Sequence, residues 1–446
     1  MRKHTHIVLT GLLVGSFSAC NPLRTEEVID PNFPSVGAVA NNASKAQLDA
    51  LSIGEFSSVR SGNAVNGYGT YLLVVGTLGK ELFNFNGTES RWMTELNGTR
   101  AIDNSAFYNT ATTTFGVAVR QANIMLASLN NTTSVTDEQK NGYRGIANTL
   151  KGLAYLYMLN AQGSNGVRLN VEDPFKPSKP VSYAESLVGI AKYLDEGATQ
   201  LDQAGATFPY TLPSGFAGFN TPATFKRFNR AIALRVALYQ ADWAKAATLL
   251  PQTFYNATGD LNVGPRNTYS ATPPDVGNPL LNTTSSQIVG AKELWDTAEP
   301  GDKRLSKVTK LATPLTYTSG ITYSTPYLTN IYKSASDAIP LIRNEELILI
   351  AAEIAAQQGN TAEATRHINI VRTAAGLPNY AGATTKDALI NAILRERQFS
   401  LFFEGHRWVD MRRYNKLNEI VVPAGMKVLE RLERPVQEVN WDVFNP

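Results

Sequence analysis

The sequence predicts an all-α dominated fold in which repeated helix pairs form a scaffold for long, loop-rich excursions. Several segments place apolar residues three and four positions apart, the spacing of one helix face. Two of these segments follow each other with only a tight turn between them. Long polar stretches separate the helical segments, and these stretches contain aromatic residues, which disordered linkers lack. The 446 residues, 43% of them hydrophobic, are enough to bury a large core.

The start of the chain has the features of an exported protein. A basic N-terminus precedes an apolar run over residues 7–17, which is too short to span a bilayer. Small residues follow, and then Cys20, the single cysteine of the chain. This order resembles a bacterial lipoprotein signal, so we expect residues 1–19 to be a signal peptide and Cys20 to be lipidated. Residues 20–42 would then form a tether, and the alternative is ordinary signal cleavage with an incidental cysteine.

We expect the remaining residues, 43–446, to form a single domain built from helices. Thr136 is a candidate N-cap, and Thr221 followed by Pro222 is a typical helix start, because proline suits the first turn. The predicted helical segments before residue 300 are 116–130, 136–161, 183–203, 222–240 and 242–250.

The clearest helix pair lies at residues 343–376. Apolar residues form one stripe, Gly359 breaks the pattern, and the spacing resumes until Gly376 and Pro378 stop it. The unit is about 34 residues long, the length of a tetratricopeptide repeat. Residues 221–250 resemble a second unit, and several units should stack because one unit cannot bury its own apolar face.

Long polar stretches are the expected location of a binding site. Loops of this length within a compact protein are usually functional or disordered, and their aromatic content favours function. The stretches are 61–109, 160–180, 207–220, 256–288 and 310–340.

Composition argues against several classes of chemistry. The 41 basic and 38 acidic side chains are dispersed and give a charge of +3, so we expect no nucleic-acid partner. Beyond the signal peptide only His367 and His406 remain, and neither has a partner at zinc-ligand spacing. Phosphate-loop and nucleophile-elbow motifs are absent from the sequence, so we expect no metal and no cofactor. His367 is expected to be structural or on the surface.

The stretch 395–413 interleaves apolar residues with three acids and five arginines. A general acid among arginines would have its pKa lowered, the wrong direction for proton donation at neutral pH. We therefore expect no catalytic residue here. Arginine guanidinium groups bind carboxylates through two hydrogen bonds and suit partly buried ion pairs. We therefore expect such ion pairs to join the helix that ends near Gly405 to a short second helix and to the repeats. The predicted structural residues are Glu396, Arg397, Glu404, Gly405, Arg407, Trp408, Asp410 and Arg413.

Residues 395–399 (RERQF) and 403–414 (FEGHRWVDMRRY) closely resemble the C-terminal signature of the SusD/RagB family. Residues 344–378, 151–163 and the turn 301–304 also resemble segments of that family. The resemblance implies a non-enzymatic lipoprotein of the outer membrane that faces the cell exterior. Such a protein captures a nutrient, usually a glycan, above a SusC-like TonB-dependent transporter. Four tetratricopeptide units would support its loop-rich face.

Two other classes of protein stay open as alternatives. A secreted all-helical glycoside hydrolase would need a pair of carboxylates in a cleft, and Glu404 with Asp410 is the candidate pair. A repeat scaffold that docks only other proteins would need no small-molecule site.

Sugar binding favours aromatic rings that cover C–H faces and polar side chains that bond hydroxyls. The richest local mixture is at residues 80–92, so Trp92 is the first candidate platform; its alternative is burial against the repeats. Trp243 and Trp408 are expected in the core. The predicted ligand-binding residues are Trp92, Arg91, Asn86, Tyr68, Tyr71 and Trp295.

Overall fold

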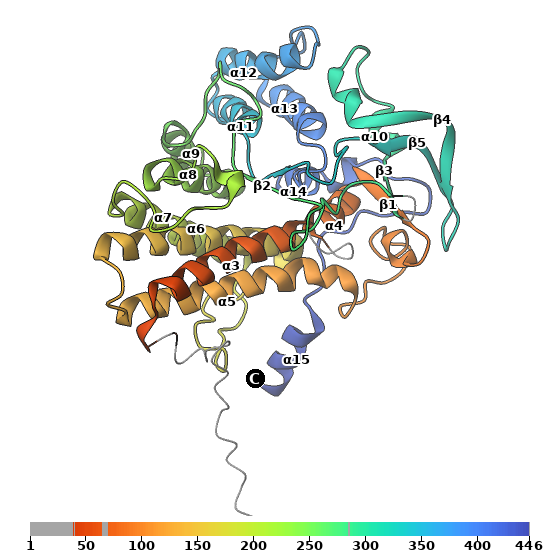
Figure 1. Cartoon of the computed structure of the whole chain (residues 1–446). Helices are drawn as coiled ribbons and strands as arrows, with labels where there is room; N and C mark the ends of the chain where they lie inside the picture. Colours follow the sequence, from red (N-terminus) through yellow and green to blue (C-terminus); the bar gives the residue numbers. More distant parts are fainter. Residues whose placement is uncertain (1–38, 40, 65–69, 284–285, 446) are drawn as a thin grey trace, which may run out of the picture.

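A computed structural model describes residues 39, 41–64, 70–283 and 286–445. Its lower half is a layer of long helices that lie side by side (Figure 1). These helices are α3 (Lys45–Ala64), α5 (Thr110–Asn131), α6 (Asp137–Gln162) and α7 (Tyr183–Asp202). The predicted signal peptide and Cys20, with most of the tether, lie outside the described residues.

The helical scaffold continues upward through shorter helices (Figure 1). Helix α11 packs against both α12 and α13, and α14 follows α13 after a short break. The all-α dominated, tetratricopeptide-like fold expected from the sequence is therefore confirmed. The bounds are α4 (Tyr71–Leu78), α8 (Pro222–Tyr239), α9 (Trp243–Leu249), α10 (Lys292–Trp295), α11 (Asn344–Gln357), α12 (Thr361–Ala374), α13 (Lys386–Ser400), α14 (Arg407–Arg413) and α15 (Val436–Phe444).

Local side-chain contacts explain where several helices begin and end. Thr136 accepts a hydrogen bond from the backbone N–H of Gln139, whose side chain bonds back, and this reciprocal cap starts α6. Thr221 caps α8 in the same way, with Pro222 in the first turn. The turn between α11 and α12 contains Gly359 at φ +79°, a left-handed conformation that only glycine adopts without strain.

Polar side chains also join the helices inside the scaffold. Asn229 of α8 is fully buried and donates to Thr149 Oγ1 of α6 at 2.7 Å and to Leu194 O of α7 at 3.1 Å. Because a buried amide without partners is costly, these bonds favour one relative position of the three helices.

A four-stranded antiparallel sheet covers one side of the helical body (Figure 1). Its strands run in the order β1, β3, β5, β4, and a second pair, β2 with β6, lies at the centre of the view. The sequence predicted irregular loops here, so that expectation is corrected. Pairing such as Phe83 with Val289 joins residues far apart in the chain, which no local pattern reveals. The bounds are β1 (Leu82–Asn86), β2 (Arg266–Asn267), β3 (Ser286–Gly290), β4 (Val308–Tyr317), β5 (Tyr323–Thr329) and β6 (Ile339–Pro340).

One large apolar core runs through the scaffold and the sheet, with smaller cores at the two ends of the helical layers. Trp408 is fully buried in it and Trp243 is packed against it, as expected. His367 is also buried and contacts the Tyr255 hydroxyl and the Glu363 carbonyl, which fits a structural role. Among the described helices, none is long and apolar enough to cross a membrane.

Candidate functional site

Trp92, the first candidate platform, is fully buried. Its ring centroid lies 4.8 Å from that of Phe107, so no face of the indole is open to a sugar. Arg91 pairs with Glu89 at 2.6 Å, and its guanidinium also lies over the Phe107 ring. Asn86 is buried at the end of β1, where its side-chain oxygen accepts from the backbone N–H of Thr88. The prediction of an exposed aromatic platform in this segment is therefore wrong.

Tyr71 and Trp295 are also core residues. Tyr71 is buried in α4, and its hydroxyl accepts from Asn160 Nδ2 at 3.1 Å. Trp295 packs edge-on against Phe402, with ring centroids 4.9 Å apart. The structure does not bring these predicted ligand residues together, and Tyr68 lies outside the described residues. A mixture of aromatic and polar residues in sequence is typical of a sugar-binding surface, but also of a turn whose aromatic side chains are buried in the core.

The C-terminal motif forms a network of buried ion pairs between helices. Arg397 Nε of α13 donates to Asp410 Oδ2 of α14 at 2.7 Å, and Arg413 Nε donates to Asp410 Oδ1 at 3.0 Å. Arg413 also pairs with Glu353 of α11. These contacts join α13, α14 and α11, which supports the structural interpretation of the motif.

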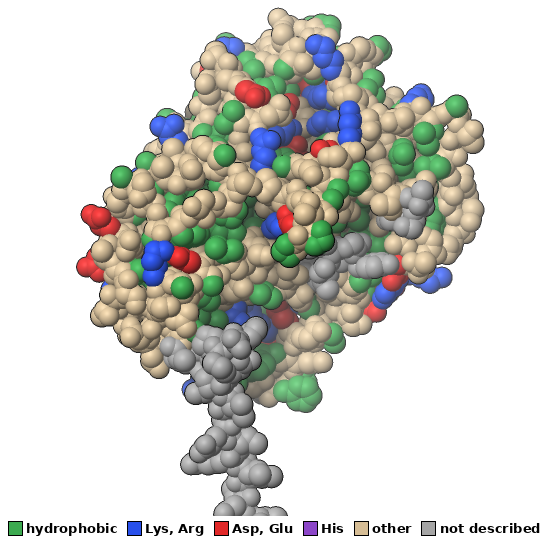
Figure 2. Space-filling view, viewed as in Figure 1, with side chains coloured by type: hydrophobic (Ala, Val, Ile, Leu, Met, Phe, Trp, Pro, Cys, Tyr) green, Lys and Arg blue, Asp and Glu red, His purple; other side chains and the backbone are tan. Residues whose placement is uncertain are grey.

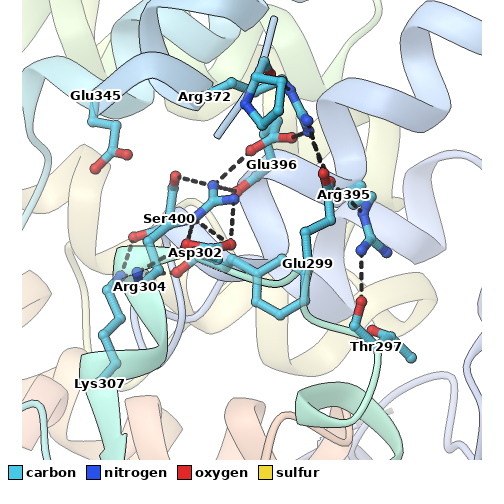
Figure 3. Close-up of polar contacts among 12 residues, drawn as sticks. Thr297, Glu299, Asp302, Arg304, Lys307, Glu345, Arg372, Arg395, Glu396 and Ser400 are labelled. Carbon is cyan, nitrogen blue, oxygen red and sulfur yellow. Dashed lines mark hydrogen bonds and ion pairs between the residues drawn. The ribbon is translucent and has the colours of Figure 1, made fainter. Parts of the chain in front are cut away.

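Glu396 extends the same network toward the start of β4 (Figure 3). One of its oxygens accepts from Arg304 at 2.6 Å and the other from Arg372 at 2.8 Å. Arg304 is bound in addition by Asp302 at 2.8 Å, so its guanidinium is held between two carboxylates. This cluster connects α12 and α13 to the segment that leads into the sheet.

The electrostatics of the motif do not suit proton transfer. Burial raises the pKa of Asp410, but the positive charges of Arg397 and Arg413 outweigh it and lower the pKa to about 2. Glu346 has its pKa lowered to about 2 in the same way, with Arg235 outweighing burial. Burial lowers the pKa of His406 to about 4, so the imidazole is neutral at pH 7. Asp410 is therefore a poor general acid for the hydrolase alternative.

Gly405 and Arg407 of the C-terminal motif have different structural roles. Gly405 has φ +80°, and an added Cβ there would lie 3.0 Å from the Tyr71 ring, so glycine is needed where the chain turns into α14. Arg407 was expected to bridge helices. It donates to the side chain of Gln398 in α13 and so joins α14 to α13, and no carboxylate of the described residues lies within ion-pair distance of it.

The described surface offers a better candidate site in a pocket of about 350 Å³ between α3 and β2. Phe56 and Phe216 form part of its apolar wall. Its polar side contains Arg60, Asn267 and Asp275, and Arg60 pairs with Asp275 at 2.6 Å. This combination of an apolar wall with a few convergent polar groups is typical of small-molecule sites. We call it the sugar pocket because we propose a sugar as its ligand.

Two donors of the sugar pocket have no hydrogen-bond partner among the described residues. They are Asn267 Nδ2 and Arg60 Nε, and both atoms are buried. Buried polar groups are nearly always bonded, so a pair without partners in one pocket suggests that ligand or water oxygens complete them. The pocket residues come from three parts of the chain: α3, the segment that precedes α8, and β2 with the residues that follow it. No sequence motif connects these parts.

Arg266 of β2 joins this pocket to two neighbouring hollows. One hollow, of about 600 Å³, extends toward Asn344 at the start of α11, and the other, of about 410 Å³, extends toward Lys307 and Arg343. Arg266 lines all three neighbouring hollows, and we call the three together the front groove. Figure 2 shows that this face of the molecule is hollowed and that Lys and Arg side chains gather around part of the hollow.

Part of the chain is similar in sequence to known proteins. Residues 303–444 match the SusD family. The matched residues make up less than half of the chain, so this match shows a likeness of the C-terminal part to that family. A relative by sequence is the SusD-like protein P38 of Formosa agariphila, 32% identical over 148 residues. That match covers 31% of this chain and only 29% of the relative.

Solved structures extend the likeness to the rest of the fold. Surface glycan-binding protein A from Bacteroides thetaiotaomicron superposes with a TM-score of 0.69 at 13% identity, covering 90% of this chain and 98% of that one. The complex of that protein with laminarihexaose gives a TM-score of 0.68 at 14% identity, covering 89% and 97%. Likeness at this identity shows a shared fold over nearly the whole chain.

Proposed function

We propose that this chain is a SusD-family cell-surface lipoprotein that captures a glycan and delivers it to a SusC-like TonB-dependent transporter. Cys20 would carry the lipid that anchors it to the outer membrane. The observation that carries the proposal is the shared fold with a surface glycan-binding protein whose complex contains laminarihexaose. We infer binding without turnover, since the most prominent carboxylate cluster is held by arginines.

The sugar pocket supplies the chemistry that saccharide binding needs. Ile53, an exposed apolar residue of the pocket lining, can contact the C–H face of a ring, and Asp275 can accept a hydroxyl hydrogen. Asn267 Nδ2 and Arg60 Nε are the donors that a sugar oxygen would complete. A ligand with oxygens at these points can bond both donors, and a ligand without them leaves both donors unpaired.

Affinity gel electrophoresis tests glycan capture and its location together. The chain without its signal peptide is run through gels containing laminarin, xylan, galactan or polygalacturonate. We expect retardation by at least one of them, and a loss of about tenfold or more in affinity for Asn267→Ala and Arg60→Gln, because each removes a donor to the ligand. Asn379→Ala, at an exposed position after α12, is the matched control.

Two results would contradict this part of the proposal. Absence of retardation in every gel, by protein whose thermal unfolding shows that it is folded, would refute glycan capture. Retardation that survives both pocket variants would refute the sugar pocket and leave glycan capture in place.

Anchoring and delivery need an experiment in the membrane. We expect the full-length chain to be found in the outer-membrane fraction and to copurify with a TonB-dependent transporter after detergent extraction. Cys20→Ala should release it from that fraction, because the lipid attachment is lost. Recovery of the wild-type chain in the periplasm without any transporter would contradict delivery.

A further inference from the structure

Four cationic side chains line the hollow of the front groove beside α11 and α13. They are Arg266, Arg304, Lys307 and Arg343, and we call this part of the groove the basic hollow. Figure 2 shows Lys and Arg side chains gathered around a depression on this side of the face. A cluster of this kind is a ligand site only if some of its charge is not already neutralised by the protein.

Two of the four cations are neutralised by carboxylates. Arg304 is held by Asp302 at 2.8 Å and by Glu396 at 2.6 Å, as described above (Figure 3). Arg343 pairs with Glu404 at 2.8 Å and with Glu345. These two arginines are part of the structural network, and their bidentate partners leave them little capacity for a further anion.

The other two cations have no carboxylate within ion-pair distance in the described part of the chain, although Glu404 and Glu345 act on Lys307 from further away. Lys307 Nζ donates to the carbonyl oxygens of Phe399 at 2.9 Å and of Ser400, at the C-terminal end of α13. Arg266 donates to the carbonyl oxygen of Asn262 at 2.7 Å. Burial, followed by the positive charge of Arg343, lowers the pKa of Lys307 to about 8. A bound anion would favour the charged form of this lysine.

A third donor in the basic hollow, the uncharged hydroxyl of Tyr332, also indicates a ligand site. Tyr332 is buried, it lines the same hollow, and its hydroxyl has no hydrogen-bond partner among the described residues. Asp337 is the carboxylate of the hollow that lies outside the arginine pairs, and it already accepts from the backbone N–H of Ser334 at 3.0 Å and from the Ser334 hydroxyl at 2.8 Å. Three donors among the residues that line the hollow therefore remain available to a ligand: an ammonium, a guanidinium and a phenol.

We propose that the basic hollow binds the carboxylate or sulfate group of an acidic glycan, with Lys307 and Arg266 as its cationic partners and Tyr332 as a hydroxyl donor. This inference rests on the proposed glycan capture, because Arg266 also lines the sugar pocket that would hold the neighbouring sugar ring. An acidic substituent would thus decide which polysaccharides this groove prefers.

Affinity electrophoresis with matched polysaccharides tests the inference. The gels contain dextran, dextran sulfate, polygalacturonate or neutral galactan, so that sulfate, carboxylate and neutral chains are compared. We expect stronger retention by an acidic polysaccharide than by either neutral one. Lys307→Gln and Arg266→Gln should each weaken that retention about tenfold, the effect of losing a charge-assisted hydrogen bond. Tyr332→Phe should weaken it several-fold.

Lys310→Gln is the control for net charge. Lys310 is exposed on β4 and does not line the hollow, yet its substitution removes the same positive charge. Equal losses for Lys310→Gln and Lys307→Gln would mean that the acidic chains are held by long-range attraction, and the inference would be wrong. If thermal unfolding shows that Lys307→Gln does not fold, Arg266→Gln decides, because this half-buried side chain makes a single carbonyl contact.

The failure of this inference can be told apart from failure of glycan capture. Retention by neutral chains alone, or acidic retention that neither variant weakens, overturns the acidic-glycan inference and leaves glycan capture standing. Absence of retention by every polysaccharide in both panels overturns both.

Discussion

Replacing Asp410 by alanine perturbs the centre of the C-terminal network most directly. Asp410 is 3% exposed, and its two oxygens accept from Arg397 at 2.7 Å and Arg413 at 3.0 Å. Arg413 keeps Glu353 as a partner in the variant, but Arg397 does not keep any direct carboxylate contact. Arg397 is 1% exposed and already has two terminal nitrogens without hydrogen-bond partners among the described residues. The substitution therefore leaves a buried guanidinium uncompensated.

The expected loss follows from that geometry. Removing one partner of a buried ion pair lowers the free energy of unfolding by about 3–5 kcal/mol. An exposed ion pair contributes only about 0–1 kcal/mol. Asp202→Ala is the matched control, since Asp202 pairs with Lys226 at 2.6 Å but its side chain is 59% exposed.

Urea unfolding followed by far-UV circular dichroism measures the difference. We expect a clearly lower midpoint for Asp410→Ala than for wild type, with an unchanged slope, and a small shift for Asp202→Ala. Affinity of the folded variant for the retained polysaccharide should stay the same, because Asp410 does not line the front groove. Equal midpoints for Asp410→Ala and Asp202→Ala would refute the structural role of the motif.

Three further predictions concern stability. Trp92→Ala should lower the free energy of unfolding, measured in urea, by about 3–5 kcal/mol, because a buried aromatic side chain is lost. If the variant kept its stability and lost its glycan affinity, Trp92 would be a ligand platform after all. Gly405→Ala should destabilise by about 1–3 kcal/mol, because φ +80° strains any side chain, and a thermal midpoint equal to wild type would contradict this. The carboxyls of Asp410 and Glu346 have pKa values lowered to about 2, below their unfolded values, so they stabilise the fold above about pH 4. That contribution should be lost as pH falls from about 4 to 2, and identical urea midpoints at pH 7 and pH 3 would contradict it.

The helical part of the fold was predictable because its signals are local. Caps such as Thr136 with Gln139 lie within one turn, and Gly359 marks the turn between α11 and α12 by its backbone conformation. The sheet was missed because its strands pair across long distances in sequence, as Phe83 does with Val289. Helix α3 (Lys45–Ala64) was not predicted, since small and polar residues interrupt its apolar stripe.

The site was less predictable than the fold for a physical reason. Trp92 and Trp295 stand in polar surroundings along the sequence, yet both rings are buried because each packs on aromatic residues from another segment. The sugar pocket depends on Arg60, Asn267 and Asp275, which come together only when α3 meets β2. The sign of the pocket is two donors that find no partner among the described residues, and hydrogen-bond satisfaction is a property of the folded chain.

A crystal structure of the chain bound to a hexasaccharide of its best-retained polysaccharide is the most direct test of the central claim, glycan capture in the front groove. The account predicts a sugar ring in the sugar pocket, with oxygens within hydrogen-bond distance of Asn267 Nδ2 and Arg60 Nε. A saccharide bound elsewhere on the molecule, or an empty front groove at saturating saccharide, would contradict it.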